Sequence, residues 1–498
     1  MKEKLLLIVL IAGLAACQSR QKEIESIEKI PYQYRSSYHF APESGWMNDP
    51  NGMVYYAGEY HLFYQYYPDG LQWGPMHWGH AVSEDMVHWE HLPIALYPDE
   101  LGYIFSGSAV VDINNTSGLG SLEEPPMVAI FTYHDMAAER QGREDYETQG
   151  IAYSMDKGRT WTKYADNPVL NNPGVRDFRD PKVIWNESTS KWIMSLAVRD
   201  HVEFYSSPDL LTWTKESEFG QNLGAHGGVW ECPDLFPLKD ENGEEKWVLL
   251  VSINPGGPNG GSATQYFIGS FDGHEYQVQD AQTRWVDIGS DNYAGVSWFG
   301  VPESDGRRLT MGWMNNWNYA NQIPQSGSRG NMTIAREFVL NENILKSVPI
   351  TELKDLRGQG TSLDVREVTS LDQESFELEM KFVSSVKAPL QLTFQNESGE
   401  ELLIEFGNGL VKVDRSKVSG NSFSEQFNPV LASSFDSDIY EVRVFVDRVS
   451  VELFVNNGSL SMTQLMFPSA ELDEVTFAGD VEAIDEVVVY PLSLKTPR

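Results

Sequence analysis

The stretch SEDMVHW, residues 83–89, recurs in altered form along the first two thirds of the chain. The other copies are SMDKGRTW at 154–161, SSPDLLTW at 206–213 and, more loosely, SFDGHEY at 270–276. In each copy a strand pattern ends, a turn containing an aspartate follows, and an aromatic residue opens the next strand. The closing aromatic residues are 72, 52 and 63 residues apart. Units of this length are typical of the blades of a β-propeller, and about five of them fit into about 300 residues.

The sequence between these copies also consists of short strand patterns. Aromatic or aliphatic runs such as HLFYQY at 61–66, KWIMSLAV at 191–198 and WVLLVS at 247–252 end at Gly, Asn, Asp or Pro. No long amphipathic helical pattern appears in this region. An irregular β-sandwich with coincidental hairpins is the alternative that the repeat alone leaves open.

The pattern changes after about residue 347. Strands then alternate more strictly between apolar and polar residues, as in SFELEMKF at 375–382 and VSVELFV at 449–455, and NNG at 456–458 is a hairpin turn signal. About 140 residues of such strands predict an antiparallel β-sandwich. The predicted fold is therefore all-β. It has a five-bladed propeller at 36–343, a linker at 344–360 and a sandwich at 361–498.

The N-terminus has the pattern of a targeting segment. Two lysines precede an apolar run at 5–14 that is too short to span a bilayer. The stretch LAAC, ending at Cys17, resembles the lipobox of bacterial lipoproteins, in which the cysteine is acylated. An ordinary signal peptide with a chance cysteine is the alternative. We expect a signal at 1–17, a polar tether at 18–35, and an exported protein that is lipid-anchored to a bacterial membrane whose face is not specified.

Charge and cysteine content exclude several classes of protein. The chain has 37 Lys and Arg against 72 Asp and Glu, a formal charge of −35, which repels the phosphate backbone of nucleic acids. Only Cys17 and Cys232 are present, so an acylated Cys17 would leave no partner for a disulfide. The histidines between 77 and 91 do not have zinc-ligand spacing. No Gly-x-Ser-x-Gly motif or phosphate loop occurs, and we expect neither a metal nor a cofactor.

Three separate acids could share one catalytic task. Asp49 lies in the turn sequence WMNDPNG, residues 46–52. Asp180 follows Arg179, whose charge should lower the pKa of that carboxyl and keep it ionised. Glu231 lies between apolar neighbours, which should raise its pKa so that it can donate a proton. Each acid also has an interpretation without a function. Asp49 could cap a turn, Asp180 could form a surface ion pair, and Glu231 could lie at a strand edge and point to water. Together they provide the charged and the protonated carboxyl that glycoside hydrolysis needs.

Four motifs resemble the signature set of glycoside hydrolase family 32, the invertases, inulinases and levanases. They are WMNDPNG at 46–52, FSGS at 105–108, RDP at 179–181 and ECP at 231–233. The resemblance covers essentially the whole chain after the targeting segment, including the C-terminal strands. It implies a five-bladed propeller followed by a β-sandwich, which agrees with the patterns above.

The resemblance also implies a role for each matching residue. Asp49 would be the nucleophile, Glu231 the acid/base and Asp180 the stabiliser of the transition state. The implied polar contacts to fructose are Asn48, Gln65, Ser106 and Arg179. The implied apolar walls are Trp46, Trp73, Phe105 and Trp313, the last preferred to Trp317. Tyr293, with Asp291, falls where the family often has a motif near the catalytic acids.

The function expected from the resemblance is that of a retaining exo-β-fructosidase. It would release terminal fructose from levan, inulin or fructo-oligosaccharides, and would cleave sucrose. A fructosyltransferase is the alternative within the family, and a fructan-binding surface protein without activity is the alternative outside it. Linkage preference, the role of the sandwich domain and the oligomeric state do not follow from the sequence.

Overall fold

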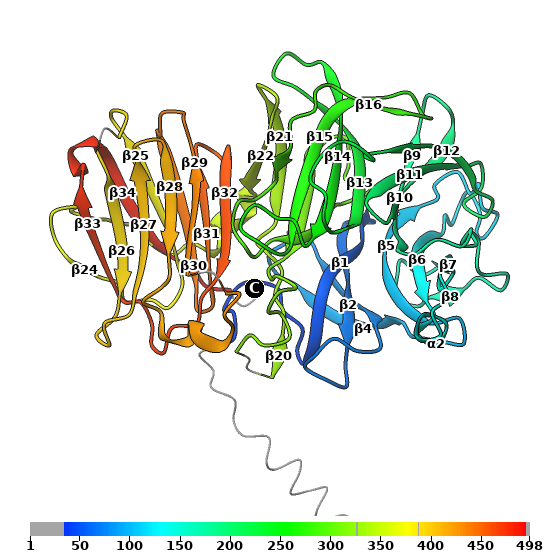
Figure 1. Ribbon diagram of the computed structural model, residues 1–498, viewed down its shortest axis with the longest axis horizontal. Helices are drawn as coiled ribbons and strands as arrows, with labels where there is room; N and C mark the ends of the chain where they lie inside the picture. Colours follow the sequence, from blue (N-terminus) through cyan, green and yellow to red (C-terminus); the bar gives the residue numbers. More distant parts are fainter. Residues whose placement is uncertain (1–33, 325–326, 387, 428, 495–498) are drawn as a thin grey trace, which may run out of the picture.

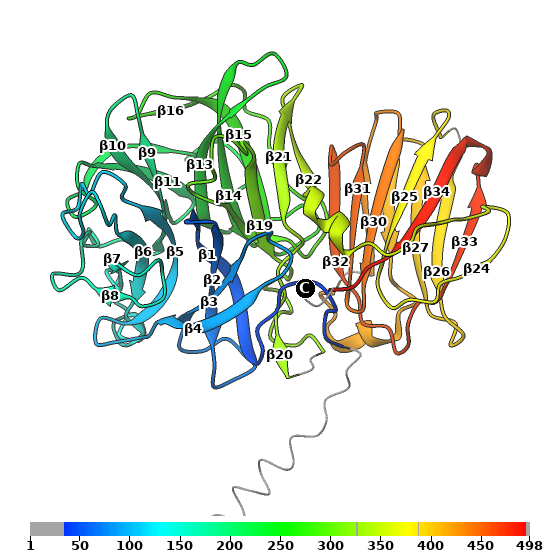
Figure 2. The same cartoon turned by 180° about the vertical axis from the view of Figure 1, so that it is seen from behind.

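The computed structural model describes residues 34–324, 327–386, 388–427 and 429–494. The predicted signal and Cys17 lie outside these ranges. Two β-domains lie side by side, as Figure 1 shows from one side and Figure 2 from the other. Within the described ranges, the only α-helix is the five-residue α2 (Met136–Arg140). No helix in these ranges is long and apolar enough to cross a membrane.

The N-terminal domain is a propeller of five sheets, in each of which the successive strands of the blade are antiparallel. The first has β1 (Gly45–Tyr56), β2 (Glu59–Tyr67), β3 (His77–Ser83) and β4 (Glu90–Leu96). The second has β5 (Tyr103–Val111), β6 (Met127–His134), β7 (Glu147–Ser154) and β8 (Thr162–Lys163). The third has β9 (Phe178–Asn186), β10 (Lys191–Val198), β11 (His201–Ser207) and β12 (Thr214–Phe219). The fourth has β13 (Val229–Lys239), β14 (Glu245–Asn254), β15 (Ala263–Phe271), β16 (Tyr276–Val278) and β17 (Arg284–Trp285). The fifth has β18 (Tyr293–Ser297), β19 (Arg308–Trp313), β21 (Arg336–Asn341) and β22 (Ile344–Pro349).

The innermost strands of the five sheets form a closed ring. Strands β1, β5, β9, β13 and β18 each contact the next, and β18 contacts β1. The short strand β20 (Ser328–Arg329) comes late in the chain and pairs in parallel with β1, which ties the fifth blade to the first. This arrangement confirms the prediction of a five-bladed propeller.

The sequence repeat marks one turn in each of the first four blades, between the third and the fourth strand. In blade 1 the Asp85 carboxylate accepts the backbone N–H of Val87 at 2.9 Å. In blade 3 Asp209 accepts the corresponding N–H of Leu211 at 2.9 Å. The indole of the closing tryptophan then donates to a backbone carbonyl three residues earlier, as Trp213 does at 3.1 Å. The repeat is thus a hydrogen-bonded corner that turns the chain into the outer strand.

The C-terminal domain packs two six-stranded antiparallel sheets face to face. The first sheet has β23 (Thr361–Ser362), β34 (Ile484–Pro491), β25 (Phe376–Phe382), β30 (Glu441–Asp447), β31 (Ser450–Val455) and β32 (Leu460–Leu465). The second has β24 (Thr369–Ser370), β33 (Glu474–Gly479), β26 (Leu390–Gln395), β27 (Glu401–Gly407), β28 (Leu410–Asp414) and β29 (Val430–Ser434). Alternate residues of both sheets fill one apolar core, which explains the period-2 pattern of the sequence.

The predicted linker began too early. Residues 344–349 form β22, which pairs with β21 as the outer strand of the fifth blade. The connection between the domains contains the 3-10 helix η2 (Thr351–Leu356). Two further 3-10 helices, η3 (Ser419–Phe423) and η4 (Val481–Ala483), lie within the sandwich.

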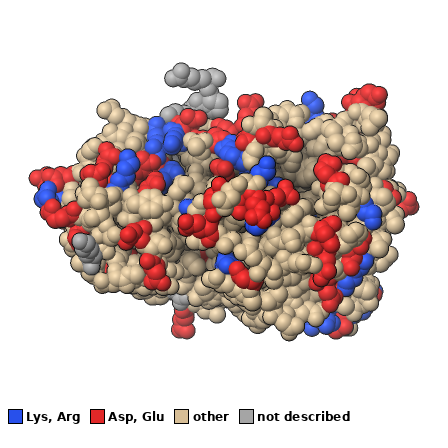
Figure 3. Space-filling view, turned by 90° about the horizontal axis from the view of Figure 1, so that it is seen from above, with Lys and Arg blue, Asp and Glu red and all other residues tan. Residues whose placement is uncertain are grey.

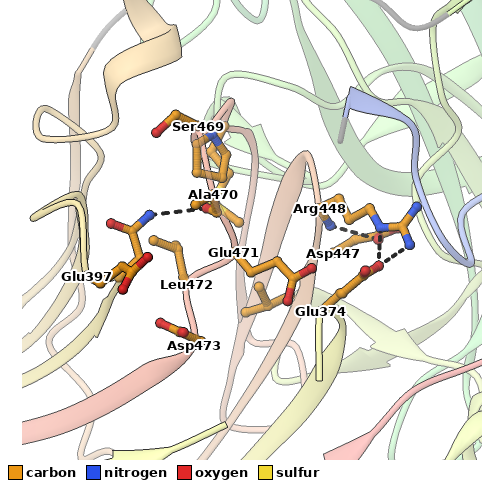
Figure 4. A pocket seen from close by; sticks show the side chains of 13 residues that line it. Glu374, Glu397, Asp447, Arg448, Ser469, Ala470, Glu471, Leu472 and Asp473 are labelled. Atoms are coloured by element: carbon orange, nitrogen blue, oxygen red, sulfur yellow. Dashed lines mark hydrogen bonds and ion pairs between the residues drawn. The ribbon is translucent and has the colours of Figure 1, made fainter. Parts of the chain in front are cut away.

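The sandwich has a cavity of its own, of about 380 Å³, at one end of its sheets. Figure 4 shows Glu374 beside Arg448 in this cavity, with Glu471 nearby. The Glu374 carboxylate accepts a hydrogen bond from the Arg448 guanidinium. None of the predicted site residues lines this cavity. On the face shown in Figure 3, acidic side chains are spread over both domains, in keeping with the charge of the chain.

A buried histidine joins the propeller to the sandwich. His39 Nδ1 lies 2.8 Å from Asp447, and its Nε2 lies 2.8 Å from Glu452, with all three side chains fully buried. Burial alone would lower the pKa of His39. The hydrogen bonds and charges of Asp447 and Glu452 outweigh it and raise the pKa to about 9. The imidazolium therefore links the first propeller segment to β30 and β31.

This triad predicts a loss of stability in alkali. Because the pKa of His39 is raised on folding, its contribution is complete below about pH 6.5 and is lost as the pH rises through about 9. We expect the free energy of unfolding to fall by about 3 kcal/mol over that interval. Denaturant unfolding at a series of pH values measures the change. A His39→Gln variant should be less stable at pH 6 and should lack this slope, and an equal slope in the variant would contradict the prediction.

Candidate active site

The three predicted acids each lie at an irregularity of an innermost strand. The pairing of β1 shifts register between Met47 and Pro50, next to Asp49. The pairing of β9 shifts at Asp180, and that of β13 shifts immediately after Glu231. The backbone at Asp180 has φ of +62°, a value that L-residues seldom adopt. Such β-bulges redirect side chains, and here they turn the three carboxyls toward one cavity on the propeller.

This cavity has a volume of about 470 Å³. Nine of the predicted site residues line it: Asn48, Asp49, Gln65, Trp73, Phe105, Ser106, Arg179, Asp180 and Glu231. They come from the first four blades, so the site exists only in the assembled propeller.

Asp49 is a half-buried carboxyl that accepts hydrogen bonds from a hydroxyl and an amide. Its Oδ2 accepts the Ser106 hydroxyl at 2.7 Å, and its Oδ1 accepts the Asn48 amide at 3.1 Å. Burial raises the pKa of Asp49 to about 6, and the nearby charge of Glu231 adds to this, while the two hydrogen bonds oppose it. Asp49 is therefore ionised at neutral pH and can act as a nucleophile.

The acid limb of the pH profile should report the ionisation of Asp49. We expect kcat/KM to fall below about pH 6, because only the ionised carboxylate can attack. A Ser106→Ala variant loses a hydrogen bond that stabilises the ionised form, so its acid limb should move upward by about one pH unit. Rates measured from pH 4 to 8 test this. The matched control is Ser108→Ala, whose hydroxyl donates to the Pro181 carbonyl and not to Asp49. Equal limbs in both variants would contradict the assignment.

Asp180 differs from its prediction. Its Oδ2 accepts the backbone N–H of Cys232 at 3.0 Å and lies 3.6 Å from the Cys232 thiol. Burial raises the pKa of Asp180 and outweighs the lowering effect of Arg179, while the charges of Glu231 and Asp49 raise it further. The expected lowering of its pKa was therefore wrong. The Cys232 thiol also lies 3.7 Å from Asp49, so it fills the space between two of the acids.

The sequence neighbours of Glu231 had suggested that apolar side chains surround its carboxyl, and the structure shows that they do not. Trp230 is fully buried in the apolar core between blades 3 and 4, and Cys232 points at the other two acids. The Glu231 carboxylate instead lies against Arg179, with Nη2 3.1 Å from Oε1, and accepts the Tyr293 hydroxyl at Oε2. Burial and the charge of Glu231 raise the pKa of Tyr293 well above its usual value, so the phenol remains a donor.

Arg179 is itself held by acidic residues that were not among the predicted site residues. Its guanidinium contacts Asp177 at 2.6 Å and Glu147 at 3.3 Å. Glu147 is fully buried, receives the Phe178 N–H at 2.6 Å and lies 3.1 Å from His134. These side chains fix the orientation of the guanidinium beside Glu231. Asp177 stands two residues before Arg179 in the same motif, whereas nothing local marks Glu147.

The aromatic walls were only partly predicted. Trp73 and Phe105 line the cavity, and the Phe105 ring stacks on His134 with centroids 4.2 Å apart. Trp46 and Trp313 are fully buried and do not line it, so both predictions were wrong. Trp317, to which Trp313 had been preferred, lines the cavity, and its ring stacks on that of Trp46 with centroids 6.0 Å apart.

The remaining predicted residues support the site or lie outside it. The Gln65 amide donates to the Ile104 carbonyl at 3.0 Å and still lines the cavity. Tyr293 does not line the cavity and reaches the site only through Glu231. Asp291 points away from the cavity, where it receives the hydroxyl of Tyr319 of the propeller at 2.5 Å and the N–H of Leu465 of the sandwich at 2.9 Å. The cavity also has a wall that was not predicted, formed by Met136 and Glu139 of α2.

In the described part of the chain, one group of side chains has the spacing of metal ligands. His201, Glu203 and Glu218 lie on β11 and at the edge strand β12 of blade 3, away from the cavity. The Lys215 ammonium contacts Glu203 at 2.5 Å and Glu218 at 3.1 Å. The Lys215 ammonium already supplies these two carboxylates with the positive charge that a bound metal ion would supply.

Two models of one protein family together match residues 39–491 of the chain. Residues 39–349 match the model of the glycosyl hydrolases family 32 N-terminal domain, and residues 350–491 match the model of the family's C-terminal domain. The boundary between the two models falls at the end of β22. The levanase of Bacillus subtilis (strain 168) is 44% identical over 99% of this chain and 75% of that protein. The extracellular exo-inulinase of Aspergillus awamori is 38% identical over 91% of this chain and 93% of that protein.

Solved structures give the same result. The crystal structure of exo-inulinase from Aspergillus awamori has a TM-score of 0.84 and 34% identity, covering 92% of this chain and 98% of that one. The β-fructofuranosidase of Schwanniomyces occidentalis, complexed with fructosyl-erythritol, has a TM-score of 0.84 and 30% identity, covering 94% of this chain and 100% of that one.

Proposed function

The chain belongs to glycosyl hydrolase family 32, and on this premise we propose that it removes fructose units one at a time from the ends of β-fructans. It is a glycosidase of the β-fructofuranosidase type, acting on fructan and sucrose. The observation that carries the proposal is the convergence of Asp49, Asp180 and Glu231 on one cavity. Trp73, Phe105 and α2 line the walls of the cavity. The proposal of cleavage at chain ends draws on the similarity to the extracellular exo-inulinase of Aspergillus awamori.

The charge of the cavity favours neutral sugars. Arg179 is its only basic residue other than histidine, and three carboxylates already contact the guanidinium. The acidic residues that line the cavity are Asp49, Glu139, Glu147, Asp177, Asp180 and Glu231. A phosphorylated sugar would therefore meet repulsion without a free cation to bind it.

The proposed mechanism proceeds with retention of configuration. Glu231 protonates the glycosidic oxygen while Asp49 attacks the anomeric carbon of fructose. The leaving sugar departs, and Glu231 then takes a proton from water, which releases fructose from Asp49. Asp180 lies beside Asp49, with the Cys232 thiol between them. Its carboxyl would hold fructose hydroxyls, and in its ionised form it would also stabilise the oxocarbenium character of the transition state.

The products formed from inulin and levan test this proposal. An exo-acting hydrolase releases free fructose from the first minutes, and the polymer shortens slowly. Chromatography of timed samples would show fructose as the only small product. Early release of mixed oligosaccharides would overturn the exo assignment. New, longer oligosaccharides formed from concentrated sucrose would instead indicate transfer to a sugar.

We further propose that Cys17 is acylated and anchors the protein to a bacterial membrane. The support is the LAAC sequence after a short apolar run with two preceding lysines. In a bacterial host, the wild type should incorporate labelled palmitate and sediment with membranes. A Cys17→Ala variant should do neither, and membrane association that survives this change would contradict the proposal.

A further inference from the structure

One propeller segment lies along the edge of the sandwich. The segment 286–291 is part of the connection from β17 to β18. It runs alongside β32, the sandwich strand nearest the propeller in Figures 1 and 2. The Ile288 N–H donates to the Ser461 carbonyl at 2.9 Å, and the Asp291 N–H donates to the Thr463 carbonyl at 3.1 Å. The segment thus hydrogen-bonds along the edge strand of the sandwich while belonging to the propeller.

A buried ion pair fastens the end of this segment. Asp291 is fully buried, and its Oδ2 receives the Leu465 N–H at 2.9 Å and lies 3.2 Å from Nη1 of Arg415. Arg415 follows β28 in the sandwich, is itself fully buried, and has its guanidinium 3.5 Å from the ring centre of Phe427. Removing one partner of such a pair leaves a buried charge without compensation, which favours displacement of the segment.

Asp291 is two residues before Tyr293, which contacts Glu231, the proposed acid/base. Strand β18 begins at Tyr293, whose hydroxyl donates to Oε2 of Glu231. Between Asp291 and Tyr293, the buried Asn292 donates its amide to Asp287 at 3.3 Å. Just after Tyr293, Ala294 has φ of +54° and donates its N–H to the Ser252 hydroxyl at 3.1 Å, so the chain has little freedom on either side of Tyr293. A displacement of Asp291 would therefore be transmitted to the phenol of Tyr293.

We propose that Arg415, in the sandwich domain, is a positioning residue for Glu231, acting through Asp291 and Tyr293. This inference rests on the proposed function, since it assigns the sandwich a part in the same reaction. Arg415 does not touch the cavity. It holds the segment that holds the phenol, and the phenol keeps the Glu231 carboxylate directed at the glycosidic oxygen. A misplacement of about 1 Å can cost about a hundredfold in rate, so an indirect support of this kind affects turnover.

The test compares two substrates that differ in their need for an acid. Glucose leaves from sucrose only with protonation, whereas nitrophenolate leaves from p-nitrophenyl β-fructofuranoside with little help. The quantity measured is the ratio of kcat/KM for sucrose to kcat/KM for the aryl fructoside, in which the amount of folded enzyme cancels. We expect this ratio to fall about tenfold or more in Tyr293→Phe, and several-fold in Arg415→Met and in Asp291→Asn.

Arg443→Met is the matched control. Arg443 is also a buried arginine of the sandwich, with Glu377 2.7 Å from its Nε and a phenylalanine ring beneath its guanidinium, but Glu377 lies within the sandwich. Its ratio should equal that of the wild type, even if the variant is less stable. An unchanged ratio in Arg415→Met and Asp291→Asn would overturn the inference, whatever their stability. A wild type that cleaves neither substrate would instead overturn the proposed function.

Discussion

An Asp49→Ala variant is expected to lose hydrolysis of sucrose and fructans by at least about 10⁴-fold in kcat/KM. Removing a nucleophile eliminates the covalent step and leaves only the binding and electrostatic contributions of the site. Such a loss corresponds to about 5 kcal/mol of transition-state stabilisation. Initial rates at saturating and at low substrate concentration measure it. Activity within tenfold of the wild type would rule out Asp49 as the nucleophile.

Removal of the Asp49 charge should not weaken the fold. Burial raises the pKa of Asp49 from 3.8 to about 6, so its ionised form is disfavoured by folding at neutral pH. Ionised Asp49 therefore destabilises the folded state, and the free energy of unfolding falls as the pH rises above about 4. An Asp49→Asn variant, which keeps the shape of the side chain, should gain up to about 3 kcal/mol in the free energy of unfolding at pH 7. Denaturant unfolding therefore separates a catalytic loss from a folding defect, because a catalytic loss at Asp49 comes with higher stability and a folding defect comes with lower stability.

The architecture could be predicted because it repeats. The corner built from Ser, Asp and a closing aromatic residue recurs with the same hydrogen bonds in different blades, so the sequence itself shows the unit. The sandwich could be predicted because the sequences of its strands alternate, with every second residue contributing to one apolar core. The linker could not be located, because β22 is an outer strand whose pattern differs little from the residues that follow it.

The site was predicted less well, and the errors have one physical cause. Neighbours along a strand point to opposite faces, so adjacency in sequence does not mean contact. Arg179 precedes Asp180 but contacts Glu231, Asp177 and Glu147. The apolar neighbours of Glu231 likewise point away from its carboxylate. Where a bulge reverses the alternation, only the folded backbone determines where each side chain points.

Contacts between site residues that are far apart in the chain could also not be predicted from the sequence. Glu147 lies in β7 and reaches Arg179 from a different blade. Trp317 lines the cavity while Trp313, four residues earlier in a similar context, is buried behind it. The choice between the two depends on how the chain leaves β19, which ends at Trp313. No local pattern encodes that path.

A Glu231→Ala variant should lose about 10² to 10⁴-fold in kcat for sucrose, the usual contribution of a general acid/base. The loss should be small in the first step for p-nitrophenyl β-fructofuranoside, because its leaving group needs little protonation. Water would then attack the fructosyl-enzyme slowly for want of a base. A burst of nitrophenol, equal to the amount of enzyme, should therefore precede slow turnover.

Azide distinguishes this role from a merely structural one. Azide is an anion that needs no base, and removal of the Glu231 carboxylate opens space for it beside the Arg179 guanidinium. We expect azide to accelerate turnover of the aryl fructoside by Glu231→Ala, with β-fructosyl azide as the product, and to leave the wild type unaffected. The retained configuration would show that two displacements occur and that Asp49 carries the intermediate. An inverted azide, or no burst and no rescue, would exclude Glu231 as the acid/base of a retaining mechanism.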